Sequence, residues 1–199
     1  MAHDHDHEHD EHDHDDRELT EAEARAEAER LVRKDVALAQ IRQYGDPALR
    51  MRAADVEAFD DELRRVSERM MGLMHDAEGV GLAATQVGIL RRFFVCTVDD
   101  EDRVLVNPVV TPLSDDTEVD QEGCLSLGPI RIPVERAARV RVEARDEAGE
   151  PVSLELEGVD ARVVQHEIDH LDGTLIIDRT DPEARRDALR QLRPRLVLA

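Results

Sequence analysis

The segment His166-Glu167-Ile168-Asp169-His170 has two histidines four positions apart, with a glutamate directly after the first. On a helix, residues at this spacing share a face, with Cβ atoms about 5–6 Å apart, so both imidazoles can bind one metal ion. Glu167 is then placed to move a proton of a water molecule on that ion. The pattern predicts a metal-dependent hydrolytic site. The alternative is a surface helix whose two histidines have no shared role.

A catalytic ion needs a third protein ligand and one open position. Zincin-type endopeptidases take that ligand from a downstream Glu or His, but no histidine follows His170 and the later acids lie in no such motif. Cys124 offers a thiolate instead, and a thiolate with two imidazoles suits Fe²⁺, Zn²⁺, Ni²⁺ or Co²⁺. Taken alone, Cys124 also fits a buried apolar thiol, which is the interpretation for Cys96 in the apolar FFVCTV.

The elements that must position these residues follow from periodicity and capping. The metal-binding pattern lies in a helix predicted over Val159–Leu171, with Gly173 at the C-cap. Other helices are predicted over Glu21–Ala39, Asp55–Asp76 and Asp181–Leu192. Strands are predicted over Arg92–Val98 and Val104–Val106, the latter closed by Pro108, and as a hairpin over Val140–Arg145 and Val152–Leu156. Residues 111–121 are interpreted as a polar loop. This order favours an α+β fold.

Composition limits the class of protein. The chain of 199 residues is long enough for one domain with a sizeable core. Its net charge is −21, which repels nucleic acid phosphates, so direct DNA binding is not expected. The chain has two cysteines, an acidic N-terminus and no apolar run near the roughly 20 residues of a membrane span. These features predict a cytoplasmic protein without a membrane contact.

Residues 1–18 alternate histidine with acid, and six of the nine histidines lie there. Such a segment cannot contribute to a core, so residues 1–18 are predicted to be a disordered tail, followed by a helical extension over 19–37 and a catalytic domain over 38–199. The tail's imidazoles suit weak binding of extra metal ions, as a loading or buffering arm for the catalytic site. The alternative is a solvated tail without a function.

Three motifs occur in order: GVGLAATQ at 79–86, EGCLS at 122–126 and QHEIDHLDG at 165–173. Together with IRQYGDPALR at 41–50, they make the chain resemble peptide deformylase from about residue 38 to 192. The resemblance implies antiparallel β-sheets around a central HExxH helix, with a C-terminal helix. It also implies removal of the N-formyl group from the formyl-methionine of nascent polypeptides. Two features depart from the family: the proline in LSLGPIR stands one residue late, and the extension before the core is unexplained.

The resemblance also implies roles for single residues. Cys124, His166 and His170 match the family's metal ligands, with Fe²⁺ as the expected ion, and Glu167 matches its general acid/base. The side chain of Gln86 and the backbone N–H of Leu125 match the donors that polarise the formyl oxygen. A backbone contact to the substrate is implied at Gly81, and an ion pair between Glu122 and Arg136 is implied to brace the cysteine segment.

The substrate pocket is less defined by the sequence. A formyl-methionine pocket needs apolar walls, for which Val80, Leu82 and Val163 are candidates, although ordinary core positions explain them equally well. Arg131 is a candidate contact for the peptide backbone, or a solvated surface residue. A ribosome contact through the last helix is a further expectation. Two other functions stay open: a non-catalytic metal-binding protein on a deformylase scaffold, and an HExxH metallopeptidase.

Overall fold

The computed structural model describes residues 20–192, so the expected tail over residues 1–18 lies outside the described residues. The helices are α1 (Glu21–Leu38), α2 (Asp61–Asp76), α3 (Gly158–Leu171) and α4 (Pro182–Leu192). Short 3₁₀ turns cover Pro47–Arg50, Ala84–Val87 and Ile176–Asp178. Within the described residues, no helix is long and apolar enough to span a membrane.

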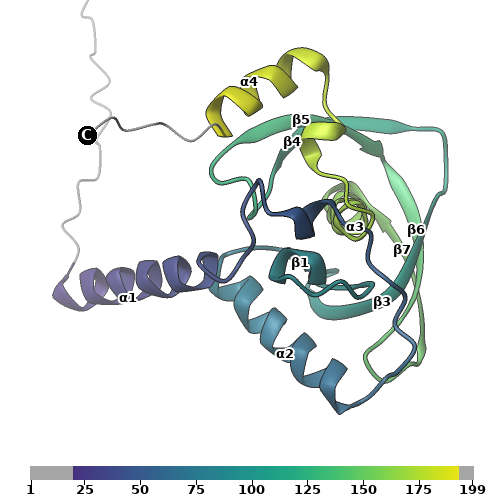
Figure 1. Ribbon diagram of the computed structural model, residues 1–199, viewed down its shortest axis with the longest axis horizontal. Coiled ribbons are helices and arrows are strands. Elements are labelled where there is room, and N and C mark those ends of the chain that lie inside the picture. The colour runs from purple at the N-terminus through teal and green to yellow at the C-terminus, as the bar shows by residue number, and fades with distance from the viewer. Residues whose placement is uncertain (1–19, 193–199) are drawn as a thin grey trace, which may run out of the picture.

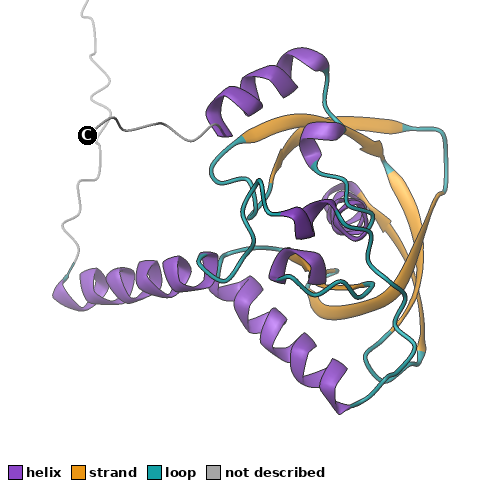
Figure 2. Ribbon diagram, viewed as in Figure 1, coloured by secondary structure: helices purple, strands orange, loops and turns teal. Residues whose placement is uncertain are grey.

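The strands form two antiparallel sheets. The larger sheet has the order β1 (Gly81–Ala83), β2 (Phe93–Val98), β3 (Glu101–Pro112), β6 (Arg139–Arg145) and β7 (Pro151–Glu157). The smaller one pairs β4 (Thr117–Gly123) with β5 (Arg131–Ala137). Figures 1 and 2 show α3 in the middle of the molecule, with the β4–β5 pair on one side and the larger sheet curving around the other. The predicted α+β fold with antiparallel sheets and a C-terminal helix is confirmed.

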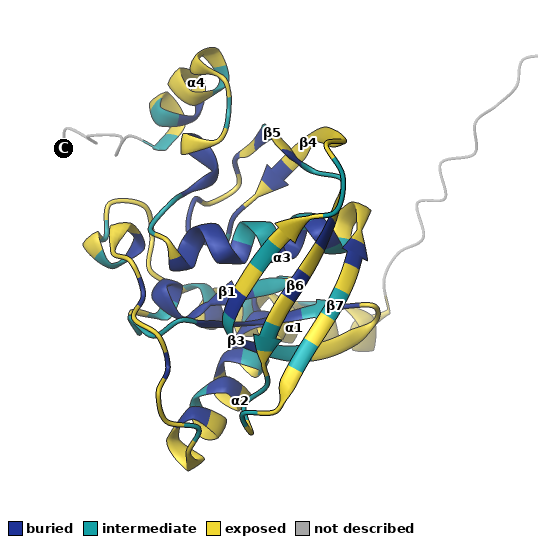
Figure 3. Ribbon diagram, turned by 90° about the vertical axis from the view of Figure 1, so that its right-hand side faces the viewer, coloured by how far each residue is buried: buried dark blue, intermediate teal, exposed yellow. Residues whose placement is uncertain are grey.

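Helix α3 is buried because its apolar residues face the larger sheet. Ala161, Val164, Ile168 and Leu171 recur at helical spacing and belong to one cluster with residues of β2, β3, β6 and β7. Figure 3 shows that most of α3 is buried, while buried or half-buried and exposed residues alternate along β6 and β7. Packing around α3 therefore fixes the helix that carries the HExxH segment.

Helix α2 begins at Asp61, and the predicted start at Asp55 is wrong. Asp60 is the N-cap, and its side chain accepts a hydrogen bond from the backbone N–H of Leu63 at 3.0 Å. A cap of this kind competes with any helical turn that would precede it, so residues 55–59 stay non-helical. For α1, by contrast, the predicted start at Glu21 is confirmed: Thr20 and Glu23 form a capping box there, and the helix ends at Leu38.

Strand β3 does not end before Pro108, as predicted, but continues to Pro112. The register against β6 shifts between Val106 and Val109, so Pro108 lies in a bulge where no ladder hydrogen bond is required of it. Asn107 in this bulge has φ 51°, and its side-chain amide bonds both backbone groups of Val56 at 2.8 and 2.9 Å. The bulge thereby binds the segment that leads into α2.

The polar loop predicted over residues 111–121 is also wrong, because β4 begins at Thr117. In β4, only Glu122 is buried, so the strand lacks the alternation of apolar and polar residues that marks a half-buried strand. Its pairing with β5 is regular and runs from Thr117 opposite Ala137 to Gly123 opposite Arg131. This pairing brings the residue after the strand, Cys124, to the end of the small sheet.

Candidate active site

Cys124, His166 and His170 come together from two elements. Their candidate ligand atoms all lie within 4.8 Å of one another. Cys124 and His170 are buried, and the side chain of His166 is 11% exposed. Sγ of Cys124 and Nε2 of His170 are 3.2 Å apart. Two donors bonded to one ion at about 2.3 and 2.0 Å lie roughly 3.5 Å apart in a tetrahedral site, so the spacing fits a single ion. A soft thiolate and two imidazoles suit a divalent transition metal.

The orientation of His166 is set from behind by Glu122. Nδ1 of His166 lies 2.9 Å from Oε2 of Glu122, which leaves Nε2 as the ring nitrogen free to bind an ion. Nε and Nη2 of Arg136 donate to the two oxygens of Glu122 at 2.9 and 3.0 Å. Burial opposes ionisation of Glu122, but the hydrogen bonds of Arg136 and His166 outweigh it and hold its pKa well below its usual range. The ion pair expected between Glu122 and Arg136 is present.

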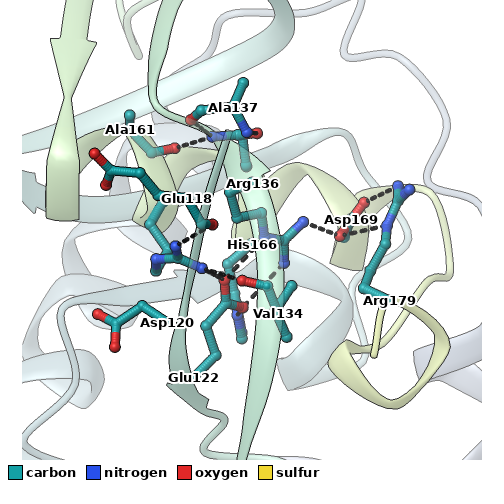
Figure 4. A network of polar contacts seen from close by, with 12 residues as sticks. Glu118, Asp120, Glu122, Val134, Arg136, Ala137, Ala161, His166, Asp169 and Arg179 are labelled. Atoms are coloured by element: carbon teal, nitrogen blue, oxygen red, sulfur yellow. Dashed lines mark hydrogen bonds and ion pairs between the residues drawn. The ribbon is translucent and has the colours of Figure 1, made fainter. Parts of the chain in front are cut away.

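Arg162, one turn before His166 on α3, is a second cation on Glu122. Its Nη1 donates to Oε1 of Glu122 at 2.9 Å and to the carbonyl of Val134 at 2.8 Å. Its Nη2 donates to the carbonyl of Glu118 at 2.9 Å. Figure 4 shows its partners Glu118, Glu122 and Val134 close together, where β4 and β5 face α3. Nothing in the sequence singled out Arg162; the only available signal was a lone arginine on an otherwise apolar stretch of the helix.

The network extends to the other end of the HExxH segment. Nη1 of Arg136 donates to Oδ2 of Asp169 at 2.5 Å, and Arg179 bonds both oxygens of the same carboxylate at 3.1 and 2.5 Å. Arg136 and Asp169 are almost fully buried, so both charges require these partners. Asp169 lies between the two candidate histidine ligands in the chain, and its pairing holds that turn of α3 toward β5 (Figure 4).

Glu167 lies in a confined space beside the candidate ligands. Its side chain is buried, its Oε2 has no hydrogen-bond partner among the described residues, and burial raises its pKa to about 7. Gly81 of β1 lies opposite, and a Cβ at that position would overlap with the Glu167 carboxylate. A carboxyl group with such a pKa is suited to exchange protons near neutral pH.

Gln86 is buried next to the thiol, in the turn that follows β1. Its Oε1 accepts a hydrogen bond from the backbone N–H of Ala83 at 2.8 Å, which fixes the orientation of the amide. Nε2 therefore points toward Oγ of Ser126 at 3.1 Å and Sγ of Cys124 at 3.8 Å. A side-chain donor thus lies beside the candidate metal site, where it is suited to bind a developing oxyanion.

A groove of about 770 Å³ opens over these residues. Besides Cys124, His166, Glu167 and Gln86, it is lined by the predicted residues Gly81, Val80, Val163, Leu125 and Arg131. The expectation for Leu82 is wrong: this side chain is fully buried in the cluster of α2 and β2, because alternation along β1 turns it away from the groove. His170 lies beneath the groove, in contact with Cys124. The groove has the size of a ligand site.

Comparison with known proteins gives a consistent result. A family model described as polypeptide deformylase matches residues 38–186. A peptide deformylase of Thermotoga maritima is 49% identical over 146 residues, covering 73% of this chain and 89% of its own. One of Chromohalobacter salexigens is 44% identical over 163 residues, covering 80% and 96%.

Solved structures agree with this result. The crystal structure of the Thermotoga maritima peptide deformylase has a TM-score of 0.69 at 49% identity and covers 71% of this chain and 97% of its own. That of a Synechococcus elongatus peptide deformylase in complex with actinonin has a TM-score of 0.72 at 40% identity, with coverage of 76% and 84%.

Proposed function

This chain belongs to the peptide deformylase family, and from that premise we propose which of its residues perform the reaction. The protein is a metal-dependent hydrolase that removes the N-formyl group from the formyl-methionine of nascent polypeptides. One observation carries the assignment of residues. The donor atoms of Cys124, His166 and His170 lie within 4.8 Å of one another, at the floor of the groove that Glu167 and Gln86 line.

We assign the binding of one divalent ion to Cys124, His166 and His170. When bound, such an ion acts as a Lewis acid that acidifies water and polarises a carbonyl oxygen. The mixed thiolate and imidazole set suits Fe²⁺, Zn²⁺, Ni²⁺ and Co²⁺ alike. We propose Fe²⁺ as the native ion because of the membership in the family. Glu122, held by Arg136 and Arg162, keeps the imidazole of His166 in one orientation.

Glu167 is the proposed general acid and base. Its pKa of about 7 allows it to accept a proton from the attacking water and to return that proton to the leaving amine nitrogen. Hydrolysis of the formamide then releases formate and a free amino terminus. The confined position of the carboxylate, between α3 and Gly81, limits the directions from which a substrate reaches it.

Two donors are proposed to bind the oxygen of the formyl group as it becomes negative. The amide of Gln86 is already oriented by Ala83, so it needs no rearrangement during the reaction. The backbone N–H of Leu125, directly after the thiol ligand, is the second. The peptide itself is proposed to contact Gly81, Val80, Val163 and Arg131, all of which line the groove.

The substrate class supports three further proposals. An enzyme that acts on nascent chains is expected in the cytoplasm, with a ribosome contact through α4. The stretch that matches the family begins at residue 38, which supports a catalytic domain over 38–199 preceded by an extension over 19–37 and a tail over 1–18. The histidines of that tail are proposed to bind additional metal ions.

The first test is anaerobic hydrolysis of formyl-Met-Ala-Ser, followed as formate release, with metal content determined on the same sample. Acetyl-Met-Ala-Ser serves as the control, because a larger acyl group must fit the same confined space. We expect rapid formate release with one ion per groove and no reaction of the acetyl peptide. No formate from a sample shown to carry iron or nickel would instead favour the non-catalytic metal-binding protein.

The substitution Glu167→Gln separates the catalytic role from metal binding. Glutamine keeps the shape of the side chain and removes its proton transfer, so the rate should fall about 10²- to 10⁴-fold while metal content is retained. The same substitution at exposed Glu68 on α2 is the matched control and should leave both quantities unchanged. A Glu167→Gln enzyme within a few-fold of the parent rate would exclude the acid/base role.

A further inference from the structure

Helix α1 contributes to the groove although it lies, apart from its last residue, before the stretch that matches the family model. Lys34 and Leu38 line the same groove as Cys124, His166 and Glu167. Figure 1 shows α1 extending from the body of the molecule, with its C-terminal end against the start of the domain. The groove of this chain thus has a wall that the family motifs do not supply.

Helix α1 is fixed to the rim of the groove by charge and by packing. Nζ of Lys34 lies 2.5 Å from Oε2 of Glu78, and Arg30 pairs with the other oxygen of the same carboxylate. Ala37 is buried in the cluster of α2 and β2, and Leu38 packs against that cluster. The end of α1 near the groove is therefore a fixed surface rather than a loosely attached arm.

The rim segment from Glu78 to Gly81 connects this wall to the catalytic carboxylate. Gly81 lies against Glu167. Glu78 is three residues before Gly81, so the Cα atoms of Glu78 and Gly81 are at most roughly 11 Å apart. An extended peptide advances about 3.3 Å per residue. A peptide that has its first residue at Glu167 and runs along this rim toward α1 reaches Glu78 with its third or fourth residue.

The charges at this end of the groove favour acceptors on the peptide. Each oxygen of Glu78 already faces a cation, Arg30 or Lys34. The hydrogen bond to Glu78 uses only one of the three N–H donors of Lys34. The long alkyl stem of Lys34 and the side chain of Leu38 add apolar surface beside these donors. A carboxylate is thus favoured over an ammonium group here.

We propose that α1 is the distal wall of the peptide-binding groove and that Lys34 determines specificity at the third and fourth residues of the formylated peptide. This inference rests on the proposed function and deepens it. Lys34 and Leu38 contact the peptide beyond the formylated residue, and an acidic side chain at the third residue is preferred to a basic one.

The test compares formyl-Met-Ala amide with two tetrapeptide amides, formyl-Met-Ala-Glu-Ala and formyl-Met-Ala-Lys-Ala. A partly exposed ion pair changes binding by a modest factor, so the parent enzyme should favour the Glu peptide over the Lys peptide about two- to five-fold in kcat/KM. Lys34→Met should abolish this preference through KM, and Lys34→Glu should reverse it. High salt should weaken the preference of the parent enzyme.

The matched control is Arg25→Met, which removes a cation of the same helix that pairs with Glu29 and does not line the groove. It should keep the parent preference. The inference is overturned if the Lys34 variants keep the parent preference, if they change the dipeptide and both tetrapeptides by the same factor, or if Arg25→Met shifts the preference as much as Lys34→Met. Absence of formate from the dipeptide with the parent enzyme would contradict the proposed function instead.

Discussion

Two glycines near Glu167 are important because they have no side chain, which leaves room for neighbouring groups. Gly81 has an ordinary negative φ, so its backbone would accept another residue, and only the nearby carboxylate excludes a side chain. Gly79 is similarly close to the side chain of Leu125. The two glycines thus bring the backbone of the rim close to the groove, where a substrate peptide would pass.

Gly81→Ala is expected to lower kcat/KM for formyl-Met-Ala-Ser about 10- to 100-fold. The added methyl group would displace the Glu167 carboxylate, and displacements near 1 Å at a reacting group have effects of this size. Steady-state kinetics measures the fall in kcat/KM, and the metal content is determined on the same samples. Gly72→Ala on α2 is the control, because a Cβ there meets nothing within 4 Å. Equal rates for both variants would show that Glu167 has more freedom than the structure indicates.

Much of the site could be predicted from the sequence, because the spacing of the candidate ligands along the chain is itself typical of a metal site. His166 and His170 share a face of one helix. Cys124 lies in a short motif and offers a thiolate as the third ligand. Arg162 could not be predicted in this way, because its partners include the carbonyls of Glu118 and Val134, and backbone groups leave no mark on a sequence. The turning of Leu82 into the core depended on the register of β1, which the sequence also does not specify.

At the scale of elements, helices and strands were predicted correctly where their apolar residues follow one clear periodicity. The predictions failed where a helix cap or the pairing of strands determines the bounds of the element. The hairpin of β6 and β7 and helix α3 follow their apolar patterns closely. Helix α2 begins later than predicted, because Asp60 caps its N-terminus. Strand β4 was missed because its residues are exposed on both faces, so only its hydrogen bonds to β5 define it. That strand nevertheless delivers Cys124 to the site.

Arg162→Met is expected to weaken the binding of Co²⁺ or Zn²⁺ about 10- to 100-fold, the usual effect of removing a group that orients a ligand. The variant removes three of the hydrogen bonds that join β4 and β5 to α3, and so loosens the position of Cys124 relative to His166. Competition with a chelator, followed through the absorption of the Co²⁺–thiolate bond, measures the change in metal affinity. Ions on the histidine tail do not contribute to this absorption, because the tail has no thiolate.

Two further variants separate orientation from simple loss of charge. Arg162→Lys keeps the charge but not the fork of donors, so its metal affinity should lie between those of the parent and Arg162→Met. Arg141→Met removes an arginine that pairs with Glu155 on exposed strands, and it should bind metal as the parent does. Parent affinity in Arg162→Met would mean that the other contacts of β4 and β5 with α3 hold Cys124 in place without Arg162.

At the scale of the whole molecule, the candidate metal site lies where three packed regions meet. Cys124 belongs to the cluster that includes β5 and α4, and α3 belongs to the cluster inside the larger sheet. Leu125, the next residue, packs against the third cluster, which contains α2. An ion bound by Cys124 and the two histidines of α3 therefore connects the cluster of β5 and α4 to the cluster inside the larger sheet, in addition to the ion pairs of Arg136 and Arg162.

Removal of the ion should therefore lower the thermal stability of the protein as well as its activity. An ion that binds only the folded chain stabilises it by about 2.7 kcal/mol at a free concentration of one hundred times Kd. For a chain of this size, that corresponds to a rise in Tm of roughly 5–10 °C. Calorimetry of the metal-free protein, with and without added Zn²⁺ at that concentration, measures the shift.

Cys124→Ala is the control that assigns this shift to the site. It retains the histidine-rich residues 1–18, where metal ions are also expected to bind, but it lacks the thiolate that joins the small sheet to α3. Added Zn²⁺ should leave its Tm nearly unchanged, because ions on the tail bind the unfolded chain as well and so favour neither state. If Cys124→Ala gains as much stability as the parent, the stabilising ion is bound elsewhere, and the ligand set proposed for the groove is wrong.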